Sequence, residues 1–317
     1  MTSAKRAILS RRRFLAWLTG SSAVTLTACT TTPTLTPAAT SPVAATATVS
    51  APTVQPTPTP LASAPASGYS IFQDTMADLT WPEIEQAAKD NTPVLFPIAV
   101  IEEHGPHLPL GTDTYLTYQF AQLAKQELEG RGHSILVMPP YYWGINVSTG
   151  SFPGSFTMQP ETLRAVLHDI FQCLSNWKFK RVFTLNLHGD YIHGRTLLEA
   201  VQAARNDLDL DVRNILDRYS LRRLGLTETG PYLVIQDVPP IDYADTHAGG
   251  SETGQFAAFY PHLANLDLAQ QLPPQNDGFT PRGYWGDPSR YDVEASRRFI
   301  ATYVRLTADA IAGALKG

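Results

Sequence analysis

Two hydrophobic patterns alternate along the chain from about residue 69 to its end. Short, almost wholly apolar runs are typical of strands buried on both faces of a sheet, and longer runs with apolar residues every three or four positions are typical of helices. The runs that predict strands are 94–101, 135–138, 181–187, 212–217 and 233–235. The runs that predict helices are 80–89, 114–129, 161–177, 195–206, 252–259 and 292–315. This alternation predicts an α/β fold, a single-domain three-layer αβα structure with a mainly parallel central sheet.

The segment before residue 69 has neither pattern. Residues 10–15 read SRRRFL, a moderately apolar stretch follows, and residues 26–29 read LTAC. Paired arginines before Phe-Leu resemble a twin-arginine export signal, and LTAC resembles a lipobox whose cysteine is lipidated. We therefore predict a twin-arginine-type lipoprotein signal peptide over 1–29, with the membrane reached through a lipid on Cys29. The alternative is an ordinary apolar start with a chance run of arginines.

Residues 30–68 are dominated by Thr, Pro, Ala and Ser, and no charged residue occurs between Arg13 and Asp74. Such a segment cannot bury a core, so it predicts a disordered linker between the lipid and a domain over 69–317. The expected location is that of an exported cell-envelope lipoprotein on the outer side of the cytoplasmic membrane.

Composition narrows the classes of partner. Apolar residues make up 43% of the chain and charged residues 17%, as in globular proteins with a core. The formal net charge of −5 provides no basic field for nucleic acid, so we expect no nucleic-acid partner.

Ligands of open parallel sheets bind beyond the carboxyl ends of the strands, so polar residues directly after the predicted strands are the candidates for chemistry. Residues 102–113 read EEHGPHLPLGTD. Glu102 and His104 are two apart, so at an extended strand end they point the same way, and the Gly-Pro turn lets the chain return to deliver Asp113. Asp113 could bridge two ions, although it could instead cap the following helix, and His107 could be a structural histidine.

Two further segments offer ligand-type residues. His188 and Asp190 follow the strand at 181–187, and His247 and Glu252 flank a run of small residues. Asp190 could be a ligand, a base or a loop aspartate at a helix start, and Glu252 could simply stabilise the first turn of a helix. We therefore expect a two-metal site of Glu102, His104, Asp113 and His188, completed by a further carboxylate from one of these segments.

These segments together resemble the creatininase family of creatinine amidohydrolases. The resemblance rests on the 102–113 motif, FPGS at 152–155, Asn-x-His-Gly at 186–189, and Asp-x-His-Ala-Gly at 245–249 with Glu252. It implies that Glu102, Asp113 and His188 hold one ion, that His104, Asp113 and a further carboxylate hold the other, and that His247 lies near the reacting group. It also implies a homo-oligomer, such as a hexamer.

The sequence departs from the family pattern at three positions. Asp190 stands where creatininase has a glutamate, Gly250 replaces the first glutamate of the usual His-Ala-Gly-Glu motif, and Gly189 stands where creatininase has a tyrosine near the substrate. The second site is therefore open between Asp190 and Glu252, and creatinine is a doubtful substrate.

The expected activity is hydrolysis of the C–N bond of a small-molecule cyclic or linear amide, a non-peptide bond, by a hydroxide that bridges two divalent ions. Zinc is the first choice of metal, with manganese or iron as alternatives. His247, Asp190 or Glu252 would move the proton to the departing nitrogen. The loops 141–151 and 277–291 are expected to line the pocket. The competing hypotheses are a lipid-anchored solute- or metal-binding protein and a catalytically degenerate family member.

Overall fold

The computed structural model describes residues 70–239, 245–279 and 281–316. The predicted signal peptide at 1–29, its Cys29 and the predicted linker at 30–68 lie outside the described residues. Within the described part of the chain, no helix combines the length and the apolar character that crossing a membrane requires.

A five-stranded, all-parallel sheet lies at the centre of the domain, with the strand order β2-β1-β3-β4-β5. The register pairs Leu95 of β1 with Phe183 of β3, and Leu185 of β3 with Ile215 of β4. The strands are β1 (Val94–Pro97), β2 (Leu136–Val137), β3 (Arg181–Leu185), β4 (Asp211–Asp217) and β5 (Tyr232–Ile235). The predicted α/β fold with a central parallel sheet is confirmed.

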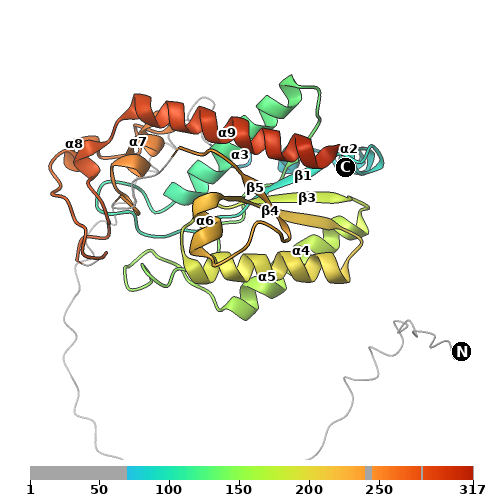
Figure 1. Ribbon diagram of the computed structural model, residues 1–317, viewed down its shortest axis with the longest axis horizontal. Helices are drawn as coiled ribbons and strands as arrows, with labels where there is room; N and C mark the ends of the chain where they lie inside the picture. The colour runs from blue at the N-terminus through green and yellow to red at the C-terminus, as the bar shows by residue number, and fades with distance from the viewer. Residues whose placement is uncertain (1–69, 240–244, 280, 317) are drawn as a thin grey trace, which may run out of the picture. The chain divides into compact units, whose positions relative to one another are not determined.

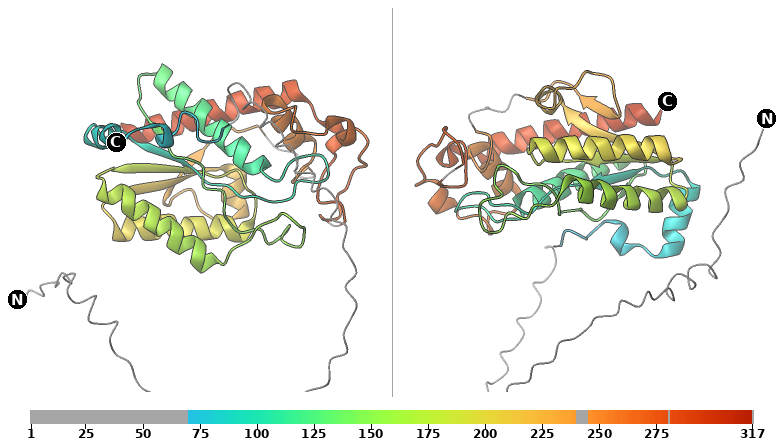
Figure 2. Two further views of the ribbon diagram at one scale, coloured as in Figure 1. Left: turned by 180° about the vertical axis from the view of Figure 1, so that it is seen from behind. Right: turned by 90° about the horizontal axis from the view of Figure 1, so that it is seen from below.

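Helices cover both faces of this sheet (Figure 1). Because successive side chains of a strand point to opposite faces, Val94 and Phe96 of β1 pack with α4 and α5, whereas Leu95 packs with α3 and α9. Figure 2 shows the α4–α5 pair side by side along one face. The helices are α2 (Trp81–Lys89), α3 (Thr112–Gly130), α4 (Pro160–Asn176), α5 (Tyr191–Asp207), α6 (Arg218–Arg223), α7 (Gly250–Phe259), α8 (Leu266–Ala269) and α9 (Val293–Leu315), with 3-10 turns η2 (Met76–Asp78) and η3 (Pro288–Arg290).

The connections create a switch point between β1 and β3. From β1 the chain crosses by α3 on one face to the edge strand β2, and from β2 it returns by α4 on the other face to β3. The segments that leave the carboxyl ends of these two neighbouring strands therefore diverge. In open α/β sheets this divergence opens the crevice in which ligands bind.

Several element boundaries differ from the predicted ones. The helix predicted at 195–206 begins at Tyr191, because the Asp190 side chain caps its first turn. The helix predicted at 114–129 begins at Thr112, which places Asp113 inside its first turn. The helices α6 and α8 were not predicted, because six and four residues are too short to establish a helical period.

Candidate metal centre

Five side chains of ligand type meet beyond the carboxyl ends of β1 and β3. Glu102 and His104 follow β1, Asp113 lies in the first turn of α3, His188 follows β3, and Glu252 lies in the first turn of α7. We call these five candidate ligands the metal centre. The first four are at most 7% exposed, so the protein has removed their charges and dipoles from water.

Asp113 lies between two imidazoles. Its Oδ2 is 2.9 Å from His188 Nδ1, and its Oδ1 is 3.3 Å from His104 Nε2. Glu102 Oε1 is also 2.9 Å from His188 Nδ1, and Glu252 Oε1 is 3.6 Å from His104 Nε2. The centre thus contains two triads, Glu102–Asp113–His188 and His104–Asp113–Glu252, each with ligand atoms within 4.8 Å of one another. Asp113 belongs to both.

Backbone and side-chain contacts orient these ligands. The Nδ1 of His104 lies 3.2 Å from the carbonyl oxygen of Glu102, and the Nε2 of His188 lies 3.0 Å from the carbonyl oxygen of Ile145. These contacts aim the opposite nitrogen of each ring at Asp113, and when that nitrogen is deprotonated its lone pair faces the carboxylate. The hydroxyl of Thr149 donates a hydrogen bond to Glu102 Oε2 and holds that carboxylate in place.

The donor set fits a divalent metal ion. The buried Nε2 of His104 makes no hydrogen bond within the described residues, although two carboxylate oxygens surround it. A buried polar atom without a partner is costly unless it has a ligand. Imidazole nitrogens combined with carboxylate oxygens are the donors that zinc, manganese and iron accept.

The electrostatics of the centre are those of a cation site. Burial opposes protonation of His104, but the carboxylates of Glu252 and Asp113 raise its pKa well above the usual value. For Asp113, burial favours the neutral acid, yet His104 and His188 lower its pKa well below the ordinary range. Burial likewise opposes protonation of His188, but Glu102 and Asp113 raise its pKa well above the usual value. The carboxylates therefore stabilise positive charge at both imidazoles, and a metal ion bound there would displace their protons.

His247 faces the centre from a different segment. Its backbone pairs with Trp285, and its Nε2 lies 2.8 Å from the carbonyl oxygen of Glu103, which leaves Nδ1 4.0 Å from Glu102 Oε1. Its ring lies against that of His104 at a centroid distance of 4.4 Å. Burial and His104 lower its pKa, but Glu103, Glu102 and Glu252 together raise it above the usual value.

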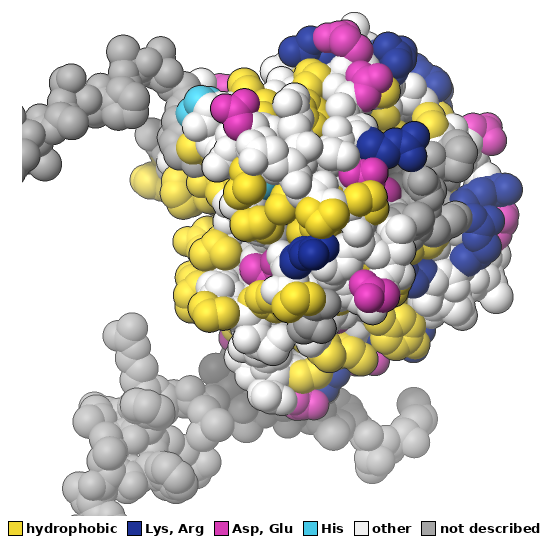
Figure 3. Space-filling model, turned by 90° about the vertical axis from the view of Figure 1, so that its left-hand side faces the viewer, with side chains coloured by type: hydrophobic (Ala, Val, Ile, Leu, Met, Phe, Trp, Pro, Cys, Tyr) yellow, Lys and Arg dark blue, Asp and Glu magenta, His cyan; other side chains and the backbone are white. Residues whose placement is uncertain are grey.

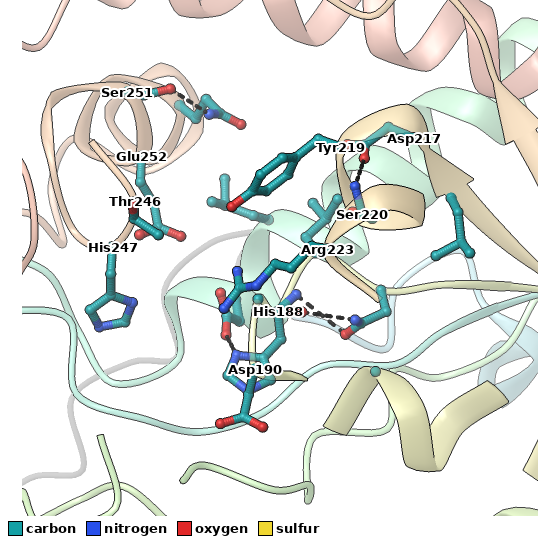
Figure 4. Close-up of a pocket in the computed structure, with 18 of the residues that line it drawn as sticks. His188, Asp190, Asp217, Tyr219, Ser220, Arg223, Thr246, His247, Ser251 and Glu252 are labelled. Atoms are coloured by element: carbon teal, nitrogen blue, oxygen red, sulfur yellow. Dashed lines mark hydrogen bonds and ion pairs between the residues drawn. The ribbon is translucent and has the colours of Figure 1, made fainter. Parts of the chain in front are cut away.

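Asp190, the other carboxylate candidate, lies in different surroundings. Its Oδ1 accepts hydrogen bonds from the backbone of Ile192 and His193 at 2.8 and 3.1 Å, and its Oδ2 accepts from Val147 and Ser148 at 2.9 and 3.4 Å. Figure 4 shows its carboxylate directed away from Glu252 and His247. Among the described residues, Asp190 is a member of none of the triads with metal-ligand geometry.

Three supporting residues were not identified from the sequence. Thr149 comes from the loop 141–151 and Phe279 from the loop 277–291, both expected to line the pocket, and Phe279 lies edge-on to His247 at 5.3 Å. Glu103 lies beside Glu102 in the motif, and its Oε1 is 3.4 Å from His247 Nε2. The proximity of Thr149 and Phe279 to the centre has no local signal, because it depends on how separate loops fold over the sheet.

The centre lies in a pocket whose lining includes Glu102, Asp113, His188, His247 and Glu252. The strands' carboxyl ends lie at the side of the domain where Figure 1 labels α7 and α8, and Figure 3 views the molecule from that side. On this face hydrophobic side chains reach the surface, interspersed with single acidic and basic ones (Figure 3).

Comparison with known proteins places these features in a family. The family model described as creatininase, creatinine amidohydrolase, matches residues 77–311. A mycofactocin precursor peptide peptidase of Mycobacterium ulcerans (strain Agy99) is 27% identical over 242 residues, which are 71% of this chain and 82% of that protein. A creatinine amidohydrolase of Pseudomonas putida is 26% identical over 208 residues, 63% of this chain and 76% of that protein.

Solved structures share the fold. A structure named "Creatininase Mn" superposes with a TM-score of 0.57 and 22% identity, and the match covers 75% of this chain and 97% of that one. At this identity the likeness establishes the common fold.

Proposed function

The chain belongs to the creatininase family of amidohydrolases, and on that premise we propose that it binds two divalent metal ions at the metal centre and hydrolyses the C–N bond of a small cyclic or linear amide. The observation on which this rests is the position of Asp113. Each of its oxygens faces a different imidazole, at 2.9 and 3.3 Å, so Asp113 would serve as a ligand in both triads.

We assign one ion to Glu102, Asp113 and His188, and the other to His104, Asp113 and Glu252. Glu252 is preferred to Asp190 as the completing carboxylate because its Oε1 approaches His104, whereas both oxygens of Asp190 accept backbone hydrogen bonds. The Oε2 of Glu252 accepts a hydrogen bond of 2.6 Å from the backbone of Ala248, which orients the other oxygen toward His104. Zinc is the first choice of metal, with manganese or iron as alternatives.

Bound ions of this kind supply a Lewis acid for the amide carbonyl and an activated water. The protein's own contribution is proton transfer and orientation. His247 holds its Nε2 on the Glu103 carbonyl, so its Nδ1 is free to carry a proton toward the departing nitrogen. Water then adds hydroxyl to the acyl carbon and a proton to the nitrogen, which yields an acid and an amine.

Metal analysis of the purified chain tests the binding part of the proposal. The reconstituted protein should contain two ions per chain, and His188→Ala should lose at least one. His168→Ala is the matched control, since His168 is partly exposed on α4 and lies 3.9 Å from Asp207, away from the centre. Less than one ion per chain in the wild type, with no change in His188→Ala, would refute the assignment.

A hydrolysis screen of cyclic amides, linear amides and formamides with zinc- and manganese-loaded protein tests the chemical part. A peptide bond is the second candidate, because the Mycobacterium ulcerans relative is named as a peptide peptidase, so short peptides belong in the same screen. Tight ligand binding without turnover of any amide would favour instead the solute- or metal-binding hypothesis or a degenerate family member.

Export, lipidation and assembly are further parts of the proposal. The SRRRFL and LTAC motifs support an exported lipoprotein anchored through Cys29, and the Cys29→Ala variant should lose lipid labelling and leave the membrane fraction. The exposed Trp143, Val147 and Phe156, at 42, 63 and 53% exposure, support a homo-oligomer such as a hexamer. Light scattering of the purified domain measures its oligomeric state.

A further inference from the structure

A basic side chain reaches the pocket from a helix that the sequence did not predict. Arg223 is the last residue of α6, which follows directly on β4 and is capped by Asp217 through a 2.6 Å hydrogen bond from Ser220 N. Leu221 and Leu224 pack into a small apolar cluster and fix the rotation of this helix. Figure 4 shows the Arg223 side chain running from α6 toward His188.

Arg223 is the single Lys or Arg among the described residues that line this pocket, and its guanidinium has no hydrogen-bond or ion-pair partner among the described residues. Arg218 of the same helix, in contrast, lies 3.4 Å from Glu228. The nearby carboxylates outside the metal centre have their own backbone donors, as Asp190 and Asp217 show. The charge of Arg223 is thus available to a ligand.

Gly189 provides the space that Arg223 occupies. A side chain at position 189 would begin 3.1 Å from Arg223 Nη1, and the backbone there does not have the positive φ that requires glycine. The absence of a side chain therefore lets the guanidinium lie beside the residue that follows the ligand His188. A planar guanidinium forms paired, charge-assisted hydrogen bonds with a carboxylate in a way that lysine or a neutral group cannot.

Resting on the proposed function, we infer that Arg223 recognises a carboxylate on the substrate and makes the enzyme selective for amides with a carboxylate close to the scissile C–N bond. With both ions bound, four positive charges face the three carboxylates of Glu102, Asp113 and Glu252. Asp190, Asp217 and Asp245 also line the pocket, but backbone N–H groups donate hydrogen bonds to each of them. Arg223 therefore adds to the net positive charge at the metal centre itself, and an anionic substrate compensates this charge.

Matched substrates test this inference. The metal-loaded protein is assayed with N-acetylglycine and N-acetylglycinamide, and with their N-formyl counterparts. Each pair exchanges a carboxylate for a carboxamide, and because the carboxamide is itself a hydrolysable amide, release of acetate or formate is the readout. The wild type should hydrolyse the carboxylate member with a kcat/KM about tenfold to a hundredfold higher. Arg223→Gln should reduce the ratio of kcat/KM for the carboxylate member to kcat/KM for the carboxamide member to near one, mainly by raising KM for the carboxylate. Arg223→Lys should restore part of this ratio. Arg218→Gln, on the same helix outside the pocket, should keep the wild-type ratio.

A bulky side chain at position 189 provides a second, independent variant. Gly189→Leu should displace the guanidinium and lower the carboxylate-to-carboxamide ratio as Arg223→Gln does, without removing the charge from the chain. A ratio that survives in both variants would overturn the inference, because the carboxylate would then be bound elsewhere in the pocket, for example by the metal ions.

The failures of the two proposals can be told apart. If the wild type hydrolyses both members of each pair equally, the carboxylate inference is wrong and the amidohydrolase proposal stands. If it hydrolyses neither, the amidohydrolase proposal fails for these amides, and calorimetric titration with N-acetylglycine decides the inference. Binding that weakens about tenfold or more in Arg223→Gln supports a carboxylate site, and equal binding by both proteins refutes it.

Discussion

The contrast between Asp190 and Glu252 gives the sharpest prediction, because both carboxylates line the same pocket but have different partners. Replacing Asp190 by alanine should cost stability and leave the number of bound ions at saturation unchanged. Replacing Glu252 by glutamine should lower the number of ions from two to one. Each variant removes one carboxylate, so each controls for the other.

The hydrogen bonds of Asp190 set the size of the effect. Loss of the cap on α5 should lower the free energy of unfolding by about 1 kcal/mol. Loss of each hydrogen bond from Val147 N and Ser148 N should lower it by about 0.5–1.5 kcal/mol. The free energy of unfolding should therefore fall by about 2–4 kcal/mol in Asp190→Ala. For a domain of this size each kcal/mol lowers Tm by about 2–4 °C, so the shift is measurable. The Asp190→Asn variant keeps a side-chain oxygen that can cap α5, so its free energy of unfolding should fall by less than that of Asp190→Ala.

The assay combines urea unfolding of the metal-free proteins with metal analysis after reconstitution in excess zinc. The loop anchored by Asp190 also bears Ile145, which orients His188, and Thr149, which orients Glu102. The metal affinity of the Asp190→Ala variant should therefore weaken by about tenfold to a hundredfold, while the protein still binds two ions at saturation. An Asp190→Ala protein of wild-type stability that binds one ion, beside a Glu252→Gln protein that binds two, would refute this division of roles.

Three further predictions follow from the same geometry. Asp113→Asn should lose both ions together, as metal analysis will show, and retention of one full ion would refute the shared ligand. Thr149→Val should weaken metal affinity about tenfold to a hundredfold in a chelator competition, since Glu102 loses its hydroxyl donor, and unchanged affinity would contradict that role. Burial lowers the pKa of His107 to about 4 and, with His188, that of His193 to about 3, so in the unfolded chain these histidines bind protons at higher pH than in the fold. These two neutral histidines therefore stabilise the fold above about pH 6.5, and this stabilisation is lost as the pH falls toward 4. The free energy of unfolding of the metal-free protein should drop by about 1.4 kcal/mol per pH unit for each histidine, and a flat pH profile in urea unfolding would refute this.

Local patterns predicted the fold class and the first ligands. The alternation of apolar runs with helical periods requires a parallel sheet covered on both faces, and the structure has five such strands. Glu102 and His104 could be proposed together because side chains two apart on an extended segment share a side. Both do approach Asp113 or its partners, although β1 itself ends earlier, at Pro97. These inferences use residues close in sequence, whose relative placement the backbone geometry alone determines.

The contacts between distant segments needed the tertiary structure. A carboxylate at the start of a helix has the same local pattern whether it stabilises the helix or binds an ion. Asp190 and Glu252 therefore could not be told apart until their partners in distant segments, Val147 and His104, were known. Arg223 had no signal at all, because its helix has six residues and is held in place by the packing of Leu221 and Leu224. The sequence by itself determined the fold class and proposed the donors of the metal centre. Only the packing of loops and helices over the sheet decided that Glu252 faces the imidazole of His104 and that the side chain of Arg223 enters the pocket. The distances between such remote segments depend on the whole core.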